Sequence, residues 1–223
     1  MNELRSRVST GLPALDRVLE GGLTEGFTFL LGGRPGAGKT TLTLQALNGL
    51  GQRCLYASGE ETLEQIKATA RRIGAVSDQI CLLSERRLGE ILERARATRA
   101  QVVAIDTIQT LTCEHVSGRP GFPAQLRAGV KRLIDFSATS GTTLWLVGHL
   151  TSRGDIAGPR TIEHDVDVVL RLDQEDAVRI LGCPDKNRFG PTNVVGRLEP
   201  TARGFVDADE EASVSVETTH AAS

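Results

Sequence analysis

Short apolar runs alternate along this chain with longer stretches in which apolar and polar positions recur at helical spacing. Runs of mostly apolar residues predict buried strands at residues 27–31, 54–58, 79–83, 102–106 and 143–148. Helical periodicity falls between them, over residues 41–47, 61–73, 87–98 and 123–139. This alternation predicts an α/β fold in which helices cover a mostly parallel sheet.

The pattern changes after residue 165. Apolar runs at residues 165–172, 177–182 and 194–198 are joined by turns, and no segment between them is long enough for a helical crossover. We therefore expect an antiparallel extension of the sheet and one domain that covers residues 1–206. From residue 207 onward, acidic, hydroxyl-bearing and alanine residues dominate, so we expect residues 207–223 to form a disordered tail.

Composition narrows the class of protein. At 223 residues the chain is long enough to bury a core without metal or disulfides, and its four cysteines include no C-x-x-C pair. We therefore expect reduced thiols and no zinc module. The net charge of −2 does not indicate general nucleic-acid binding, so a nucleic-acid site would be local. No apolar run approaches membrane-spanning length, which predicts a soluble, cytoplasmic protein without membrane contact.

A phosphate-binding loop lies between the first predicted strand and the first predicted helix. The run Gly33-Arg34-Pro35-Gly36-Ala37-Gly38-Lys39-Thr40 matches G-x-x-x-x-G-K-T/S, and Thr41 follows it. The glycines allow successive backbone N–H groups to surround phosphate oxygens, and the helix N-terminus adds its dipole. Lys39 is expected to reach the β- and γ-phosphates, and Thr40 is expected to bind Mg²⁺. The loop thus predicts a site for ATP and Mg²⁺.

Two carboxylates at predicted strand ends complete the expected site. Asp106 ends the apolar strand 102–106, so we expect it to hold Mg²⁺ through a water, with a turn or helix cap as the alternative role. Glu60 follows strand 54–58 and is expected to orient the attacking water. Glu61 is the alternative, but it is expected to open a helix, where an acidic side chain is a favourable partner of the helix dipole.

His149 ends the predicted strand 143–148, and its imidazole has two interpretations. It can contact the γ-phosphate and relay the presence of that group to the loop that follows. It can equally be a strand-end histidine with a local hydrogen bond. The sequence does not separate these alternatives.

Several strings of residues resemble one family of proteins. They are Thr10-Gly11-Leu12-Pro13-Ala14-Leu15-Asp16, Ser58-Gly59-Glu60-Glu61, Ile105-Asp106-Thr107-Ile108-Gln109-Thr110, Ile156-Ala157-Gly158-Pro159-Arg160 and Lys186-Asn187-Arg188-Phe189-Gly190. In this order, from about residue 8 to about residue 206, the chain resembles the ATPase domain of RadA (also called Sms), a bacterial recombination family of the RecA/DnaB superfamily. The last two strings are quite specific to that family, whereas the phosphate loop alone occurs in many.

The resemblance implies a RecA-like P-loop core in a DNA-dependent ATPase of recombination and DNA repair, which acts by branch migration or translocation on single-stranded DNA. Such proteins form homo-oligomeric rings, expected here as hexamers, with ATP between subunits. Lys186 and Arg188 match the family's lysine and arginine that reach a neighbour's site, where cations can neutralise charge on the γ-phosphoryl group. From the residues alone, a solvated turn beside Asp185 is the alternative.

Two loops are candidates for contact with single-stranded DNA. One covers residues 112–125 and contains Arg119, and the other covers residues 151–160 and contains Arg153 and Arg160. Both are rich in glycine, follow predicted strands and combine Arg with hydroxyl groups, which suits contact with backbone phosphates. Because each loop has few basic residues, ordinary solvated connectors are the alternative.

The resemblance does not extend to every part of a usual RadA protein. The family's four-cysteine zinc module and Lon-protease-like domain have no counterpart here, so we expect an excised domain or a natural short paralogue. Ser152-Arg153 stands where the family more usually has Lys-Glu. Two other functions stay open. One is a KaiC-like signalling ATPase or autokinase, which shares the opening string and the phosphate loop, and the other is an ATP-binding assembly factor with no DNA role.

Overall fold

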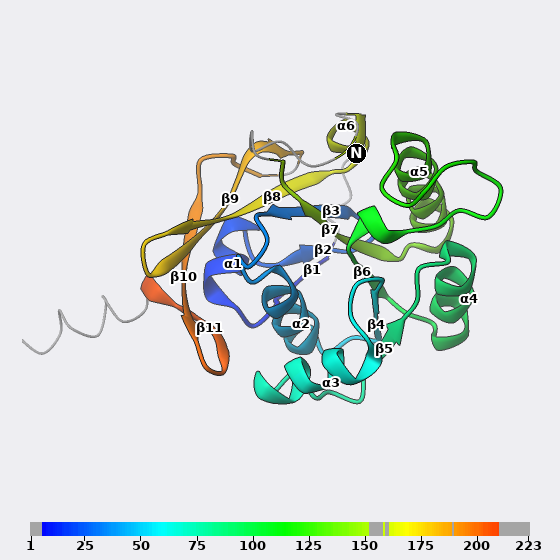
Figure 1. The fold of residues 1–223 in the computed structure, drawn as a ribbon. Coiled ribbons are helices and arrows are strands. Elements are labelled where there is room, and N and C mark those ends of the chain that lie inside the picture. The colour runs from blue at the N-terminus through cyan, green and yellow to red at the C-terminus, as the bar shows by residue number, and fades with distance from the viewer. Residues whose placement is uncertain (1–5, 152–157, 159–160, 189, 210–223) are drawn as a thin grey trace, which may run out of the picture.

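One mixed β-sheet runs through the centre of the molecule, and helices cover both of its faces (Figure 1). The computed structural model describes residues 6–151, 158, 161–188 and 190–209. Within these residues, six parallel strands form the larger part of the sheet: β3 (Thr28–Gly33), β4 (Cys54–Ser58), β5 (Ile80–Ser84), β6 (Val102–Asp106), β7 (Thr143–His149) and β8 (Val168–Glu175). Three antiparallel strands extend it: β9 (Val178–Asn187), β10 (Val195–Thr201) and β11 (Gly204–Asp207). The strand order is β11-β10-β9-β8-β3-β7-β6-β4-β5.

Two layers of helices form because alternate residues of the parallel strands point to opposite faces and most of them are apolar and buried. One face packs against α1 (Pro13–Val18), α2 (Lys39–Gly49) and α3 (Leu63–Arg72). The other packs against α4 (Leu88–Thr98), α5 (Pro123–Ser140) and α6 (Thr161–Asp165). A short antiparallel pair, β1 (Arg7–Val8) and β2 (Leu23–Thr24), lies outside the large sheet, and a 3-10 turn, η1 (Ile108–Thr110), follows β6. The predicted α/β class with an antiparallel extension is confirmed.

The antiparallel extension braces the phosphate-binding loop and the helix behind it. The Gln45 side chain of α2 pairs with the backbone of Phe205 in β11, accepting from its N–H (2.7 Å) and donating to its carbonyl (3.0 Å). Arg179 Nε from β9 donates to the carbonyl of Ala37 in the loop (3.1 Å). A Cβ atom on Gly38 would lie only 2.4 Å from Cζ of Phe205, so this ring leaves room for nothing but glycine. The extension therefore fixes the loop from its outer side.

The predicted boundary between the domain and its tail is wrong at Asp207. This residue ends β11, and its buried carboxylate accepts hydrogen bonds of 3.2 Å from Arg17, which lies in α1. A partner so distant in sequence cannot be identified from composition, which is why an acidic residue looked like the start of a tail. Residues 210–223, the rest of the expected tail, lie outside the described residues.

Two further boundaries differ from the predicted ones. The strand predicted from residue 165 begins at Val168, because Asp165 still belongs to α6. The strand predicted over residues 177–182 extends as β9 to Asn187, and so includes the first residues of the string that starts at Lys186.

The structure describes all four cysteines and the helices whose length and apolar character bear on membrane spanning. Cys54, Cys81, Cys113 and Cys183 are free cysteines. No helix among the described residues has the length and apolar character needed to cross a membrane.

Candidate nucleotide-binding and hydrolysis site

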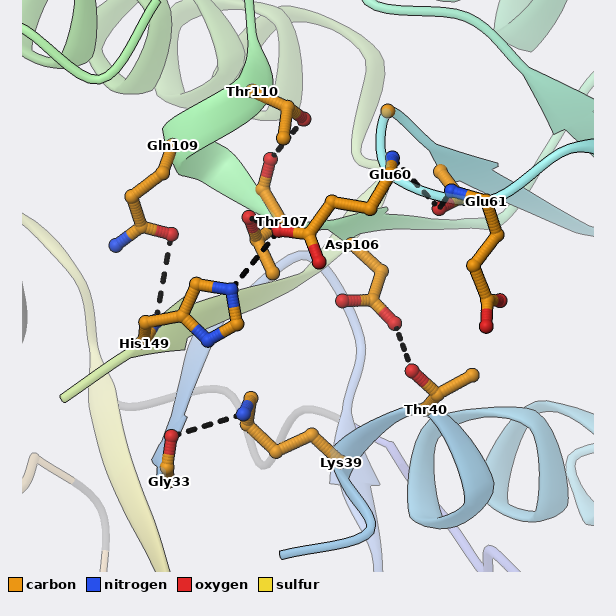
Figure 2. Close-up of polar contacts among 12 residues, drawn as sticks. Gly33, Lys39, Thr40, Glu60, Glu61, Asp106, Thr107, Gln109, Thr110 and His149 are labelled. Atoms are coloured by element: carbon orange, nitrogen blue, oxygen red, sulfur yellow. Dashed lines mark hydrogen bonds and ion pairs between the residues drawn. The ribbon is translucent and has the colours of Figure 1, made fainter. Parts of the chain in front are cut away.

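The carboxyl ends of neighbouring parallel strands gather the residues that the sequence predicted to act together. The strands β3, β7, β6 and β4 are adjacent in the sheet, and they end at Gly33, His149, Asp106 and Ser58. Figure 2 shows side chains turned toward one common space from Lys39, Thr40, Glu60, Asp106 and His149. In open parallel sheets, ligands bind at this edge, and the observed cluster lies there.

The phosphate-binding loop joins β3 to α2 and has the backbone shape that its glycines allow. Gly36 and Gly38 have φ values of 80° and 100°, in the left-handed region that residues with a Cβ rarely adopt. Residues 34–36 are exposed at the middle of the loop, whereas Ala37 and Lys39 are buried at its end. The exposed backbone and the N-terminus of α2 form a cradle for an anionic group.

Lys39 lies across this loop. Its Nζ donates hydrogen bonds to the carbonyls of Gly33 (2.9 Å; Figure 2) and Arg34 (3.1 Å). Burial lowers the pKa of Lys39, and the charges of Asp106 and Glu60 oppose that shift. A cation held among carbonyls and carboxylates in this way is available to a phosphate chain bound in the loop.

Asp106 lies almost entirely below the surface, with 5 % of its area exposed. Thr40 Oγ1 from α2 donates to its Oδ2 over 2.7 Å, and the Tyr56 hydroxyl from β4 donates to the same oxygen over 2.7 Å. Burial raises the pKa of Asp106, and these two hydrogen bonds oppose the rise. Thr40 and Asp106 were both expected to hold Mg²⁺, and the structure places them within hydrogen-bond distance of each other. Tyr56 was not among the predicted site residues. Its position in β4, the strand that Glu60 follows, was the available signal.

Glu61 does not open a helix, so that expectation is wrong. The helix α3 begins after Thr62, whose hydroxyl accepts from Gln65 N (3.3 Å) while the Gln65 side chain accepts from Thr62 N (2.8 Å). This reciprocal cap places Glu61 outside the helix. Its N–H donates to Ser58 Oγ (3.1 Å), and its carbonyl accepts from Ser84 Oγ (2.8 Å).

The oxygen groups beside α2 fit Mg²⁺. They include the Asp106 carboxylate and the Thr40 hydroxyl, and Mg²⁺ prefers oxygen ligands, often completed by waters and phosphate oxygens. Glu61 Oε2 is buried and has no hydrogen-bond partner among the described residues. Burial raises the pKa of Glu61, and the charges of Asp106 and Glu60 raise it further. A bound cation would offset this concentration of negative charge, so Thr40 and Asp106 are the residues suited to hold it.

Glu60 is held by groups from two neighbouring strands. Thr107 Oγ1 donates to Glu60 Oε1 over 2.8 Å, and His149 Nε2 lies 2.9 Å from the same oxygen (Figure 2). Burial alone would raise the pKa of Glu60, but these hydrogen bonds, together with the charges of His149 and Lys39, outweigh it and hold the pKa below its ordinary value. Glu60 is therefore an ionised acceptor at neutral pH.

The turn that carries Glu60 is anchored on both sides of Gly59. Gly59 N donates to the carbonyl of Asp106 (3.1 Å), and Arg86 Nε donates to the carbonyl of Gly59 (2.6 Å). A Cβ atom on Gly59 would lie 2.1 Å from Oγ1 of Thr110, so only glycine fits here. The place of Glu60 thus depends on β6 and on the residues that follow it.

His149 makes the local hydrogen bond that was one of its two interpretations. Besides the contact of its ring with Glu60, its backbone N–H donates to Gln109 Oε1 (3.4 Å). Its Nδ1 is buried and has no hydrogen-bond partner among the described residues, and this nitrogen faces the side of Lys39 in Figure 2. Contact between His149 and a phosphate stays a prediction.

Of the remaining predicted residues, those that the structure describes lie apart from this cluster. Lys186 Nζ donates to the carbonyls of Glu163 (3.1 Å) and His164 (2.6 Å), at the end of α6. Burial, and then the charge of Arg188, lower the pKa of Lys186. Arg188 and Arg119 are exposed. Outside the described residues lie Arg153 and Arg160.

Comparison with known proteins supports the fold first. A family model described as "ATPase: KaiC" matches residues 8–81. Among solved structures, the RadB recombinase is similar with a TM-score of 0.68 at 21% identity, over 90% of this chain and 99% of that one. A KaiC-like protein from Pyrococcus horikoshii is similar with a TM-score of 0.72 at 23% identity, over 91% and 99%. These structural likenesses show that the chain shares its fold with both proteins.

Curated relatives cover far more of this chain than the family model does. The DNA repair protein RadA of Pseudomonas aeruginosa is 39% identical over 211 residues, which cover 93% of this chain. The RadA proteins of Escherichia coli and Campylobacter jejuni are 38% and 41% identical, again over 93% of the chain. The resemblance to RadA is confirmed. The chain spans about half the length of these RadA proteins, since the matches cover 47%, 46% and 48% of them.

The hydrogen bond from Thr107 to Glu60 generates a prediction about ionisation. Thr107→Val removes one of the groups that lower the pKa of Glu60, so this pKa should rise. Without this hydrogen bond, fewer groups oppose the effect of burial, which raises the pKa of Glu60. The pKa can be measured from the carboxyl carbon shift of Glu60 in a pH titration by NMR. Ser84→Ala is the control, because that hydroxyl binds the backbone of Glu61 instead. An unchanged Glu60 midpoint in Thr107→Val would contradict the assignment.

Proposed function

We propose that this protein hydrolyses ATP as a RadA-type ATPase of DNA repair and recombination. The observation that carries the proposal is the placement of Glu60: an ionised acceptor shares one edge of the sheet with the hydrogen-bonded pair of Asp106 and Thr40. The relatives named DNA repair protein RadA, which match 93% of the chain, support the biological setting.

Each group at this edge has a distinct part in the proposed reaction. Lys39 and the loop N–H groups bind and neutralise the phosphate chain, and they hold the γ-phosphoryl group in line with the water. Glu60 accepts a hydrogen bond from that water and so orients it for attack. When bound, Mg²⁺ would supply positive charge to the phosphate oxygens beside Thr40 and Asp106. His149 and Thr107 keep Glu60 ionised and in place.

This division of roles predicts different defects for two variants. Lys39→Ala should lose tight ATP binding, because the cation that faces the β/γ oxygens is removed while the loop backbone stays. Glu60→Gln should bind ATP but hydrolyse it about a hundredfold more slowly or worse, as is typical when a positioned acid–base group is lost. Fluorescent-nucleotide binding and phosphate release measure the two steps. The matched control is Glu61→Gln. If Glu61→Gln is slow and Glu60→Gln is near normal, the role belongs to Glu61.

We further propose that single-stranded DNA lies against residues 112–125. The loop has a defined shape because Gln125, with only 3 % of its area exposed, sits at its centre. Its Oε1 accepts from Cys113 N (2.8 Å), and its Nε2 donates to the carbonyls of Val116 and Gly118. A loop tied to a buried side chain presents its outer residues in fixed positions. This support is independent of the resemblance to RadA.

The outer residues of this loop combine positive charge with an aromatic ring. Arg119 is exposed, and Phe122 has 56 % of its area exposed. The first turns of α5 continue the surface with Arg127 and Lys131, which are exposed and one helical turn apart. Residues 115–134 include no Asp or Glu, and none of the three cations forms an ion pair with another described residue. Cations for phosphates and a ring for base stacking suit a single strand of any sequence.

The proposed DNA surface predicts a change in salt dependence. Arg119→Ala and Arg127→Ala should weaken binding for all sequences alike, and each should lower the slope of log affinity against log salt by about 0.7, because a phosphate contact on a single strand is lost. Phe122→Leu should weaken binding at an unchanged slope, because stacking releases no counterions. The control is Arg71→Ala, an exposed residue of α3 on the other face of the sheet. The measurement is a salt titration with labelled DNA, in an ATP analogue and in ADP. Equal slopes in all variants would remove this surface from the proposal.

A ring assembly with catalytic cations supplied by a neighbour is the third part of the proposal. Arg188 is exposed at the end of β9 and free to meet another subunit. Lys186, by contrast, is bound to carbonyls of α6, so it can act on a neighbour only after it leaves them. The match of both residues to the family's lysine and arginine is what supports their role in trans.

Mixing experiments test this arrangement. Arg188→Ala should bind ATP and hydrolyse it poorly, since a cation supplied in trans can be worth about 10³-fold or more in rate. Lys39→Ala is inactive for another reason, so mixed rings should regain part of the activity at interfaces that pair an intact loop with an intact Arg188. Phosphate release across a series of mixing ratios measures this recovery. If the rate per subunit is the same at high dilution as in the assembled state, the cations do not act in trans.

The KaiC-type family model over residues 8–81 favours one other function, a signalling ATPase or autokinase. The same hydrolysis assay with labelled γ-phosphate separates it, because label retained on a Ser or Thr of the protein would indicate self-phosphorylation. RadA relatives match nearly the whole chain, and this coverage is why we place DNA repair first.

A further inference from the structure

The hydroxyl of Tyr56 is a buried polar group with no part in the reaction described above. The whole residue is buried, with 0 % of its area exposed, yet its oxygen lies 2.7 Å from Asp106 Oδ2. Thr40 donates to the same oxygen over the same distance, and neither hydroxyl reaches Oδ1. Two donors on one oxygen define the plane and the rotation of a carboxylate group far better than one donor does.

The sheet register explains how the ring reaches this carboxylate. Tyr56 in β4 is level with Ala104 in β6, two residues before Asp106, and all three side chains lie on the face that carries α2. Ala104 has only a methyl group on this face. Trp145 of β7, the neighbour of β6 on the side away from β4, is level with Ala104. The long tyrosine side chain therefore spans the distance along the sheet from its own Cα to the end of β6.

The hydroxyls of Thr40 and Tyr56 differ in their other interactions. Thr40 belongs to the phosphate-binding loop and helix, and its oxygen is the group suited to a cation. Tyr56 donates to Asp106 from β4, a strand within the sheet, and not from the loop or its helix. The Tyr56 hydroxyl, which is supplied by the sheet, keeps the Asp106 carboxylate oriented while Thr40 Oγ1 binds the cation.

We propose that Tyr56 is a positioning residue for the magnesium site, because its hydroxyl holds the Asp106 carboxylate in the orientation that receives nucleotide-bound Mg²⁺. This inference rests on the magnesium site proposed above. Tyr56 does not touch the nucleotide or the cation, and it acts only through Asp106. The alternative is a purely structural role, in which the hydroxyl satisfies a buried carboxylate and affects folding stability alone.

Tyr56→Phe separates these roles, since it removes one oxygen and leaves the ring in its place. The affinity for a fluorescent ATP analogue is measured first in EDTA and then across a Mg²⁺ titration. We expect unchanged affinity without Mg²⁺, and a Mg²⁺ concentration for half-maximal tightening that rises about tenfold or more, the range typical for groups that orient metal ligands. A magnesium dependence equal to that of the unaltered protein would overturn the proposal.

Thr43→Val is the matched control. Thr43 is a fully buried residue of α2, and its hydroxyl accepts a hydrogen bond from Trp145 Nε1 (2.9 Å) rather than binding Asp106. It should lower the melting temperature at least as much as Tyr56→Phe without moving the Mg²⁺ titration. A shift of equal size in Thr43→Val would show that general loosening of this core, and not Tyr56, is responsible.

A second measurement leaves the amino-acid sequence unaltered. Tyr56 is the only tyrosine among the 223 residues, so biosynthetic 3-fluorotyrosine labels it alone. With the nucleotide analogue bound, adding Mg²⁺ should move the single ¹⁹F resonance, and a resonance that does not move would count against the proposal.

Failure of the magnesium site and failure of the role of Tyr56 give different results. If the unaltered protein binds nucleotide equally with and without Mg²⁺, the magnesium site itself is wrong. If the unaltered protein responds to Mg²⁺ and Tyr56→Phe responds in the same way, the magnesium site stands and Tyr56 has no part in it.

Discussion

A carboxylate buried at the end of a strand is the constraint on which this site depends. An ionised group that leaves water is destabilised by several kcal/mol unless hydrogen bonds replace its hydration. Asp106 receives two such bonds, one from α2 and one from β4, so its own burial ties the first turn of the helix to two strands. The phosphate-binding loop ends at that turn. The geometry of the loop thus depends on the hydrogen bond between Thr40 and Asp106, which lies 66 positions away in the chain.

The rest of the fold holds this arrangement from below and from the side. Beneath α2, the Trp145 ring stacks on Phe29 and its N–H donates to Thr43, one turn along the helix from Thr40. On the outer side, β9 and β11 contact the loop through Arg179 and Phe205. The antiparallel extension is therefore part of the site's support, although none of its side chains lies among the groups around Glu60. Preorganisation of this kind lets charges act on a ligand without rearrangement of the protein.

Features of the site that depend on a local sequence motif could be predicted, and features that depend on the order of strands in the sheet could not. The strands, the loop and the closeness of Thr40 to Asp106, both expected to hold Mg²⁺, could be predicted, because the loop motif and a strand ending in Asp have fixed structural meaning. The hydrogen bonds of Glu60 could not, since they require β6 to lie between β4 and β7, and alternation of elements does not specify strand order. Glu61 was assigned to a helix because the cap formed by Thr62 was missed. Each of these failures involves a partner or a boundary that periodicity does not encode.

The network around Glu60 connects the proposed hydrolysis site to the proposed DNA surface. Thr107, which holds Glu60, is followed by η1 and then by the loop of residues 112–125. The same segment supplies Gln109, which accepts from the backbone of His149, the second group on Glu60. Arg86 adds a third link, because its side chain binds the carbonyl of Gly59 while its own carbonyl accepts from Thr112 N (2.8 Å). A strand of DNA that shifts this loop would act on the hydrogen bonds that ionise and orient Glu60. Coupling of this kind requires that the loop have two arrangements that DNA and nucleotide favour unequally.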